Sequence, residues 1–270
     1  MSDVKKANRQ SSSFDLTGKK CLVVDLDGTV YVGDRAIAGA VEFLESQQKQ
    51  KEIFFLTNNS SRPPADYVDR LGRFGVRTDL EHILSPCRPL ISYLADRDIK
   101  LAIVVGTDSF QAFLRSELPD LKITSSHTNC QAVVVAFDTE LTYAKLRAAA
   151  LALQDEKMQF IATHRDKVCP TEDGPIPDIG AILALLETAT GRRPDKVFGK
   201  PDKAMLDNVL CRYTPGQIAV IGDRLYTDMA LAENAKVDFV LVLSGESSRG
   251  DIEKQGRQPS LIINSIADLA

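Results

Sequence analysis

Short apolar runs alternate along the chain with stretches whose apolar residues recur every three or four positions. Short runs rich in β-branched or aromatic residues are typical of strands buried inside a parallel sheet. The longer spacing, as in Tyr67, Leu71 and Phe74, is typical of amphipathic helices. The alternation predicts an α/β fold with a Rossmann-like, doubly wound parallel sheet. Its strands are expected at 21–24, 53–56, 218–221, 239–243 and 261–263.

The same alternation restarts near residue 85, as though a second α/β unit were inserted into the first. Within this unit, strands are expected at 100–105, 132–136 and 159–162. The Pro- and Gly-rich stretch 170–180 has the composition of a linker and hinge, and a helix beyond it resumes the first rhythm. We therefore predict a flexible N-terminal tail (1–19), a core (20–85 and 179–270) and an inserted unit (86–178).

Two carboxylates follow the first predicted strand, in the sequence Asp25-Leu26-Asp27-Gly28. The carboxyl edge of a parallel sheet is where ligands bind, and two acids there need a reason to tolerate their mutual repulsion. A hard cation such as Mg²⁺ supplies one, because it takes oxygen ligands. A plain turn after a strand is the alternative interpretation. An EF-hand loop fits poorly, because Gly28 is the fourth residue from Asp25 and that loop needs glycine at the sixth.

Polar clusters follow three further predicted strands. A hydroxyl and amide run begins with Thr57 and Asn58, Lys200 follows a short strand, and Asp223 precedes Asp228 by about one helical turn. Taken one at a time, these residues are as typical of loops, helix caps and surfaces as they are of a binding site. Because parallel strands end at one edge, however, the clusters are expected to converge on one pocket. Carboxylates would serve a metal and a nucleophile there, while a hydroxyl and an ammonium would bind phosphate.

The amino-acid composition limits which kinds of molecule the protein binds and which cellular setting it suits. A net charge of -4 disfavours binding to nucleic acid. No apolar run approaches the ~18 residues that span a membrane, and the polar tail does not have the pattern of a signal peptide. The five cysteines form no CxxC pair, which favours a reducing, cytoplasmic setting. An anionic small molecule could still bind a local positive site, and we leave a homodimer open.

The four motifs DLDGT, LTNNS, GKP and GDRLYTD, in this order, resemble those of the haloacid dehalogenase-like (HAD) phosphatase superfamily. The insert between the second and third motifs resembles its C2-type cap. From about residue 20 to 269, the chain is similar to subfamily IIA, the branch of 4-nitrophenylphosphatase, phosphoglycolate phosphatase and NagD-like nucleotide monophosphatase. The resemblance implies a Mg²⁺-dependent phosphomonoesterase that acts on a small phosphorylated metabolite through an aspartyl-phosphate.

The resemblance also implies roles for individual residues. Asp25 matches the nucleophile and Asp27 the general acid and base. Three residues match the phosphate binders: Thr57, Asn58 and Lys200. The metal site would comprise Asp25, the backbone carbonyl of Asp27, and Asp223, with Asp228 beside them to orient Lys200 or metal-bound water.

The cap departs from the pattern of this branch at two places. Thr163-His164-Arg165-Asp166 stands where Asn-Pro or Asn-Asp is common, and Pro177-Asp178-Ile179-Gly180 stands where Pro-Gly-x-Gly is common. Because His164, Arg165 and Lys167 gather cationic groups in an acidic protein, we expect them to contact a second anionic or strongly polar group of the substrate. A solvated loop is the alternative.

Other functional classes fit less well. A receiver-like phosphate-binding module carries its acids on different strands and has no inserted cap. The chain contains no Gly-x-Gly and no Gly-x-Ser-x-Gly, which disfavours a dinucleotide-binding oxidoreductase and an α/β-hydrolase. A phosphotransferase or phosphomutase of the same superfamily stays open, because a sugar hydroxyl can accept the phosphoryl group in place of water.

Overall fold

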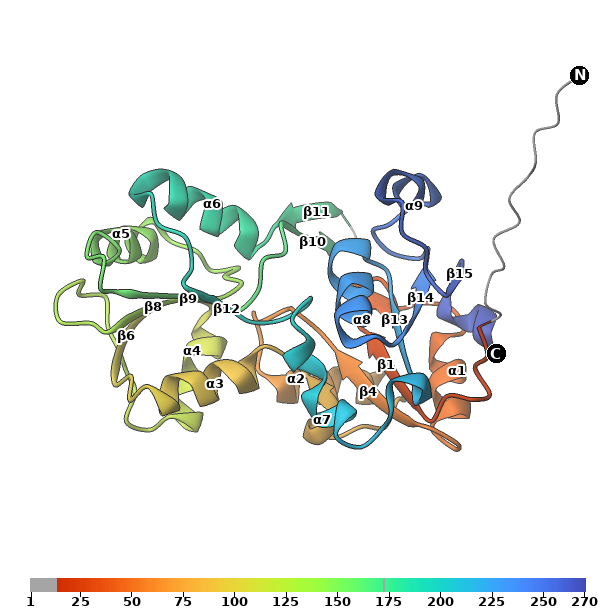
Figure 1. The fold of residues 1–270 in the computed structure, drawn as a ribbon. Helices are drawn as coiled ribbons and strands as arrows, with labels where there is room; N and C mark the ends of the chain where they lie inside the picture. The colour runs from red at the N-terminus through yellow and green to blue at the C-terminus, as the bar shows by residue number, and fades with distance from the viewer. Residues whose placement is uncertain (1–13, 172) are drawn as a thin grey trace, which may run out of the picture.

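The computed structural model describes residues 14–171 and 173–270. Two units lie side by side, each built on its own parallel sheet with helices on both faces (Figure 1). We call the unit that contains both ends of the chain the core and the other unit the cap.

The core sheet has six parallel strands in the order β15-β14-β13-β1-β4-β5. The central strand β1 (Cys21–Asp25) is buried along its whole length, which explains its unbroken apolar run. The predicted doubly wound parallel sheet is therefore confirmed. The other strands are β4 (Glu52–Leu56), β5 (Ile83–Leu84), β13 (Ile218–Gly222), β14 (Asp238–Val242) and β15 (Leu261–Ile263).

Alternate side chains of β1 enter two apolar layers, because successive residues of a strand point to opposite faces. Leu22 and Val24 pack in the layer that contains residues of α1 (Ala40–Gln47) and α2 (Pro64–Arg73). Cys21 and Val23 pack in the layer on the other face. That layer includes residues of the 3₁₀ helix η2 (Lys203–Leu206), α7 (Asp207–Leu210), the π-helix η4 (Leu225–Met229), α8 (Ala230–Ala235) and α9 (Arg249–Gln255).

Short elements complete the core. They are the hairpin of β2 (Tyr31–Val32) and β3 (Arg35–Ala36) and the 3₁₀ helices η1 (Leu80–His82), η3 (Pro215–Gln217) and η5 (Ile266–Leu269).

The cap sheet has five parallel strands in the order β12-β9-β8-β6-β7. They are β6 (Leu101–Val105), β7 (Lys122–Ile123), β8 (Ala132–Val135), β9 (Gln159–Ala162) and β12 (Lys196–Val197). Two helices, α3 (Cys87–Asp96) and α4 (Asp108–Glu117), share one apolar layer with this sheet. The other layer contains α5 (Tyr143–Ala152) and α6 (Ile179–Thr190).

The cap ends later than the sequence predicted. Helix α6 was assigned to the core, but its Leu183 and Leu186 pack in the same cluster as Val133 and Val135 of the cap sheet. Strand β12 pairs with β9, so it too belongs to the cap. The predicted boundary at residue 178 is therefore wrong, and the chain returns to the core only after β12. An apolar stripe identifies a helix, but it does not identify the sheet that the helix covers.

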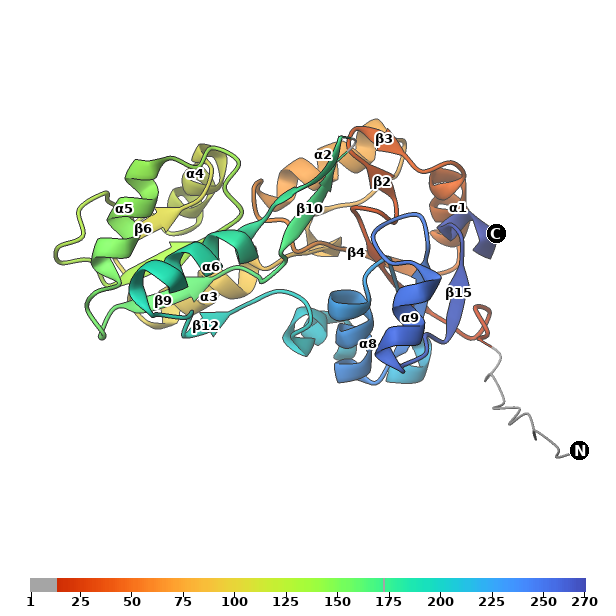
Figure 2. The same ribbon diagram turned by 90° about the horizontal axis from the view of Figure 1, so that it is seen from above.

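The segment 170–180, which was predicted to be a linker and hinge, instead contains regular secondary structure. Strands β10 (Val168–Thr171) and β11 (Gly174–Pro177) form an antiparallel hairpin, and α6 begins directly after it. Seen from above in Figure 2, the hairpin extends from the cap toward the core. Prolines are compatible with such an isolated two-stranded ribbon, because both strands are edge strands and a proline whose nitrogen points away from the partner strand removes no ladder hydrogen bond.

Part of the predicted N-terminal tail belongs to the core. Phe14 and Leu16 pack against the core cluster, and the ammonium group of Lys19 is buried and paired with Asp238. The rest of the predicted tail, residues 1–13, lies outside the described residues. All five cysteine thiols are free. Over the described residues, the helices are too short or too polar to cross a membrane.

The assignment of α6 to the cap generates a stability prediction. Leu186 is fully buried in the cap cluster, whereas the neighbouring Leu185 is 46% exposed. Leu186→Ala should lower the free energy of unfolding by about 2–5 kcal/mol, because it leaves a cavity. Leu185→Ala should change it by less than about 0.5 kcal/mol. Urea unfolding followed by circular dichroism measures both, and equal effects would contradict the packing of α6.

Candidate active site

Three strand ends meet at the carboxyl edge of the core sheet. β1 ends on Asp25, β4 leads into Thr57, and β13 leads into Asp223. These ends are neighbours because β1 is paired with both β4 and β13. Beyond β1 the chain turns at Gly28, whose φ is +88° and where a side chain would lie 2.5 Å from Asp223 Oδ2. Only glycine fits that position without displacing the carboxylate.

Residues at and just beyond these strand ends line a small pocket that the cap covers. Its volume is about 20 Å³, which is room for little more than one water molecule. The core contributes Asp25, Asp27, Thr57, Asn58, Asn59, Lys200 and Arg224, and the cap contributes Asp166, Cys169 and Asp178.

The predicted core residues do converge. Asp25, Asp27, Thr57, Asn58 and Lys200 share the pocket lining. Asp223 and Asp228 are fully buried beside it, with carboxylate oxygens within 4.8 Å of an Asp25 oxygen and of each other.

Lys200 joins two of the carboxylates. Its ammonium group contacts Asp25 and lies 2.7 Å from Asp228 Oδ1, and the side chain is almost completely buried. Burial alone would lower the pKa of Lys200, but the Asp228 and Asp25 carboxylates outweigh it and raise the pKa above its usual value. Lys200 is therefore a permanent cation at the base of the pocket.

Asn58 holds the backbone of Lys200 in place. Its Oδ1 accepts a hydrogen bond from Lys200 N at 2.7 Å, and its Nδ2 donates to Lys200 O at 3.3 Å. The preceding Gly199 has φ of +78°, and a side chain there would lie 2.7 Å from Asn58 Oδ1. The amide thus positions the lysine as well as lining the pocket.

The three clustered acids are suited to a divalent cation. Burial raises the pKa of Asp25 well above its usual value, and burial together with the Asp228 carboxylate raises the pKa of Asp223 to about 7. Asp223 Oδ2 accepts a hydrogen bond from Glu246 N at 2.6 Å, but the buried Asp223 Oδ1 has no partner in the described residues. An oxygen-preferring cation would satisfy this atom and relieve the repulsion.

Asp27 occupies a different place in the pocket. Its carboxylate is not one of the three clustered acids, although it shares the lining with them. Burial raises the pKa of Asp27, and the nearby Arg70 and Arg224 guanidinium groups only partly oppose this effect. Two carboxyl groups separated by one residue thus lie in distinct environments.

A contact between cap and core was not predicted. Asp166 of the cap accepts a hydrogen bond from Asn58 Nδ2 at 3.0 Å and pairs with Arg224 Nη1 at 2.7 Å. Arg224 Nε also lies 2.9 Å from Glu246 Oε2. Arg224 is part of the GDRLYTD motif and Asp166 is adjacent to the cap residues that were singled out, so both could have been considered from the sequence.

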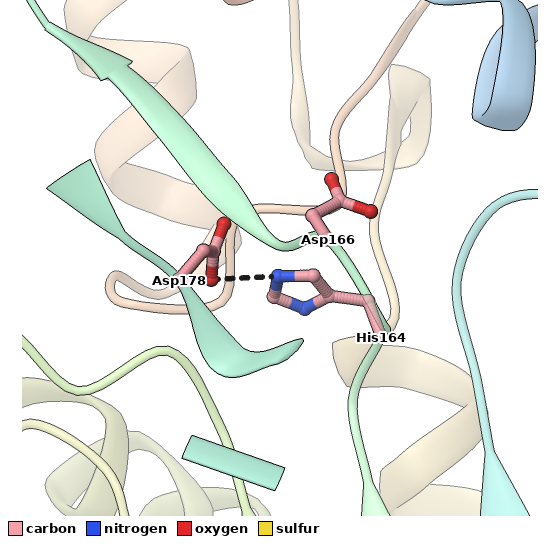
Figure 3. A group of neighbouring side chains, drawn as sticks. All are labelled: His164, Asp166 and Asp178. Carbon is pink, nitrogen blue, oxygen red and sulfur yellow. Dashed lines mark hydrogen bonds and ion pairs between the residues drawn. The ribbon is translucent and has the colours of Figure 1, made fainter. Parts of the chain in front are cut away.

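The cap residues His164, Arg165 and Lys167 do not line the pocket as the sequence suggested. Arg165 and Lys167 are exposed, whereas His164 is fully buried and contacts Asp178 at 3.1 Å (Figure 3). Alternate residues of an extended segment point to opposite sides, so the two basic residues face outward while Asp166 faces inward. The wall that the cap presents to the pocket is therefore acidic.

Comparisons with known proteins identify the family to which the chain belongs. A haloacid dehalogenase-like hydrolase family matches residues 22–117, and a HAD-hydrolase-like family matches residues 197–269. Chronophin from Bos taurus is 30% identical over an alignment of 286 positions, gaps included, that spans 97% of this chain and 96% of that protein. The chain belongs to the haloacid dehalogenase-like hydrolases. This membership, together with the cap, overturns the receiver-like alternative.

Two solved structures narrow the class. The 4-nitrophenylphosphatase of Thermotoga maritima has a TM-score of 0.83 at 33% identity, covering 93% of this chain and 96% of that one. A glycerol phosphate phosphatase of Mycobacterium tuberculosis in complex with magnesium has a TM-score of 0.81 at 29% identity, covering 94% of this chain and 77% of that one. Within its family the chain is a phosphoric monoester hydrolase of the 4-nitrophenylphosphatase and NagD-like branch.

The unpartnered oxygen of Asp223 generates a binding prediction. Saturating Mg²⁺ should raise the melting temperature by about 5 °C, because it binds the folded state alone. Asp223→Asn should remove most of this increment. Asp120→Asn, which removes an exposed acid of the cap, should keep it. Differential scanning fluorimetry at constant ionic strength measures the increment, and a full increment in Asp223→Asn would exclude this residue as a ligand.

Proposed function

We propose that the protein is a Mg²⁺-dependent phosphatase of small phosphorylated metabolites and that it works through a phosphorylated Asp25. The observation that carries the proposal is the convergence of Asp25, Lys200 and two further buried acids at one sheet edge. The names of similar proteins, a 4-nitrophenylphosphatase and a glycerol phosphate phosphatase, support the reaction class.

In the first half of the reaction, an Asp25 carboxylate oxygen attacks the phosphorus atom and the ester P–O bond breaks. Asp27 donates its proton to the departing oxygen, which leaves as a neutral alcohol. In the second half, water attacks the phosphorus of phosphorylated Asp25, and Asp27 takes the proton of that water. Inorganic phosphate leaves and both residues return to their initial states. Covalent catalysis of this kind divides one difficult hydrolysis into two easier steps.

The remaining residues hold the phosphoryl group. Lys200 supplies a fixed positive charge and the Thr57 hydroxyl supplies a neutral donor at the same edge. The Asn58 amide lies beside them and donates to Asp166 and to Lys200 O, so it would bind phosphate only after it is released from Asp166. Asp25, Asp223 and Asp228 would hold the Mg²⁺ ion, with the backbone carbonyl of Asp27 as a further ligand. When bound, the ion would neutralise phosphoryl charge and so complement the fixed ammonium group. Preorganised charge of this kind supplies most of the stabilisation in phosphoryl transfer.

The nucleophile and the metal can be tested together. Asp25→Asn should reduce phosphate release from 4-nitrophenyl phosphate to below about one ten-thousandth, because no other residue replaces the covalent step. A chelator should abolish the wild-type rate, and added Mg²⁺ should restore it. Asp120→Asn serves as the control and should keep the wild-type rate. Persistence of activity in Asp25→Asn would refute the covalent role, and persistence in chelator would refute the metal role.

The acid role of Asp27 predicts a dependence on the leaving group. Asp27→Asn should lose on the order of 10²–10⁴ in kcat for alkyl phosphates, whose leaving oxygen needs a proton. The loss should be smaller for 4-nitrophenyl phosphate, because nitrophenolate leaves without one. Steady-state rates on both esters measure the difference. Equal losses would show that Asp27 does not protonate the leaving group.

A further inference from the structure

The cap wall determines what the pocket can accept beyond the phosphoryl group. Among the described residues that line the pocket, the cations are Lys200 and Arg224, and both belong to the core. Lys200 is committed to Asp25 and Asp228, and Arg224 is committed to Asp166 and Glu246. The cap contributes two carboxylates and a thiol.

Asp178 is the cap carboxylate with a free oxygen. It caps helix α6, where its Oδ1 accepts hydrogen bonds from Ile179 N at 2.5 Å and from His164 Nε2 at 3.1 Å. Its other oxygen points away from the imidazole ring (Figure 3) and has no hydrogen-bond partner among the described residues. The side chain lines the pocket although only 3% of the residue is exposed. An unpartnered carboxylate oxygen on a residue that lines the pocket can accept a hydrogen bond from a donor that a ligand brings.

His164 fixes the direction of this carboxylate. The ring is fully buried, and its Nδ1 lies 3.0 Å from Thr163 Oγ1. That hydroxyl is in turn 2.8 Å from Ser60 Oγ of the core. The two departures from the family pattern, at residues 164 and 178, are thus bonded to each other, and the chain of contacts ties Asp178 to the core loop after β4.

A metal ion is a weaker occupant for this place. His164, Asp166 and Asp178 present ligand atoms within 4.8 Å of one another. However, both oxygens of Asp166 are already engaged, one by Asn58 and one by Arg224. A cation there would have to displace a guanidinium group from its partner. The free Asp178 oxygen is better matched to a neutral hydrogen-bond donor.

We propose that Asp178 is a specificity-determining residue that accepts a hydrogen bond from a hydroxyl of the leaving group. The inference rests on the proposed phosphatase function and names its substrate class: phosphate esters of polyols. This proposal replaces the expectation that His164, Arg165 and Lys167 contact a second anionic group of the substrate. A carboxylate or second phosphate on the leaving group would meet the negative charge of Asp178 in a site with little water, where like charges repel strongly.

The test compares two small phosphate esters of similar size. Glycerol 3-phosphate has hydroxyl donors on its leaving group, whereas 2-phosphoglycolate has a carboxylate. The wild-type enzyme should have the higher kcat/KM for glycerol 3-phosphate. Asp178→Asn retains a side chain that can cap α6 and accept from His164, but it offers an NH₂ group to the pocket. It should lower the ratio of the two kcat/KM values by about tenfold or more, because a hydrogen-bond acceptor becomes a donor.

Two controls keep the result interpretable. Asp120→Asn removes the same charge from an exposed position of the cap and should leave the ratio as in the wild type. Asp178→Ser also preserves a helix cap while removing the pocket oxygen, so it should lower the ratio even if Asp178→Asn folds poorly. A wild-type preference for 2-phosphoglycolate, or a ratio that changes less than about twofold in both variants, would overturn the inference. Failure of the wild type to hydrolyse any ester would instead refute the phosphatase function.

Discussion

Mutual repulsion among buried carboxylates is the constraint on which the site depends. Asp25, Asp223 and Asp228 have oxygen atoms within 4.8 Å of one another and are shielded from water. Lys200 contacts two of them, and Asp223 receives a backbone hydrogen bond and the packing of Gly28 and Gly245. A side chain at Gly245 would lie 2.0 Å from Asp223 Oδ2. The remaining negative charge suits a divalent cation, and such a cation together with the lysine would create a site for phosphate.

The same pairing of charges extends to the contact between cap and core. Asp166 occupies the hydrogen-bonding groups of Asn58 and Arg224 on the pocket side, and the remaining volume of about 20 Å³ is too small for a phosphate ester. The structure therefore shows the cap closed over the site, and a substrate would need the cap to move away from the core. Closure over a bound substrate would then exclude water and place the acidic wall against the leaving group.

The sequence predicted those features that depend on neighbouring residues. The strand ending at Asp25 was recognisable because a strand buried on both faces is continuously apolar, and Asp223 follows a run of the same kind. Their meeting followed from the parallel topology, since such strands end at one edge. The assignment of α6 failed because an apolar helix face, such as the one that carries Leu183 and Leu186, fits either sheet equally well. Only pairing over long distances in the sequence decides which sheet a helix covers.

The cap loop shows why grouping residues by charge can mislead. Residues 164–167 contain two basic side chains and one histidine, so the segment reads as positive. In the folded chain the exposed Arg165 and Lys167 lie outside the pocket lining, while Asp166 lies within it. Asp178, ten or more residues away, joins the same wall through the hairpin between them. The charge that a ligand meets is therefore set by the direction of each side chain and by the hairpin register, and neither is a property of the local composition. The charge of a pocket wall assembled in this way can therefore be opposite in sign to the net charge of the segment that forms it.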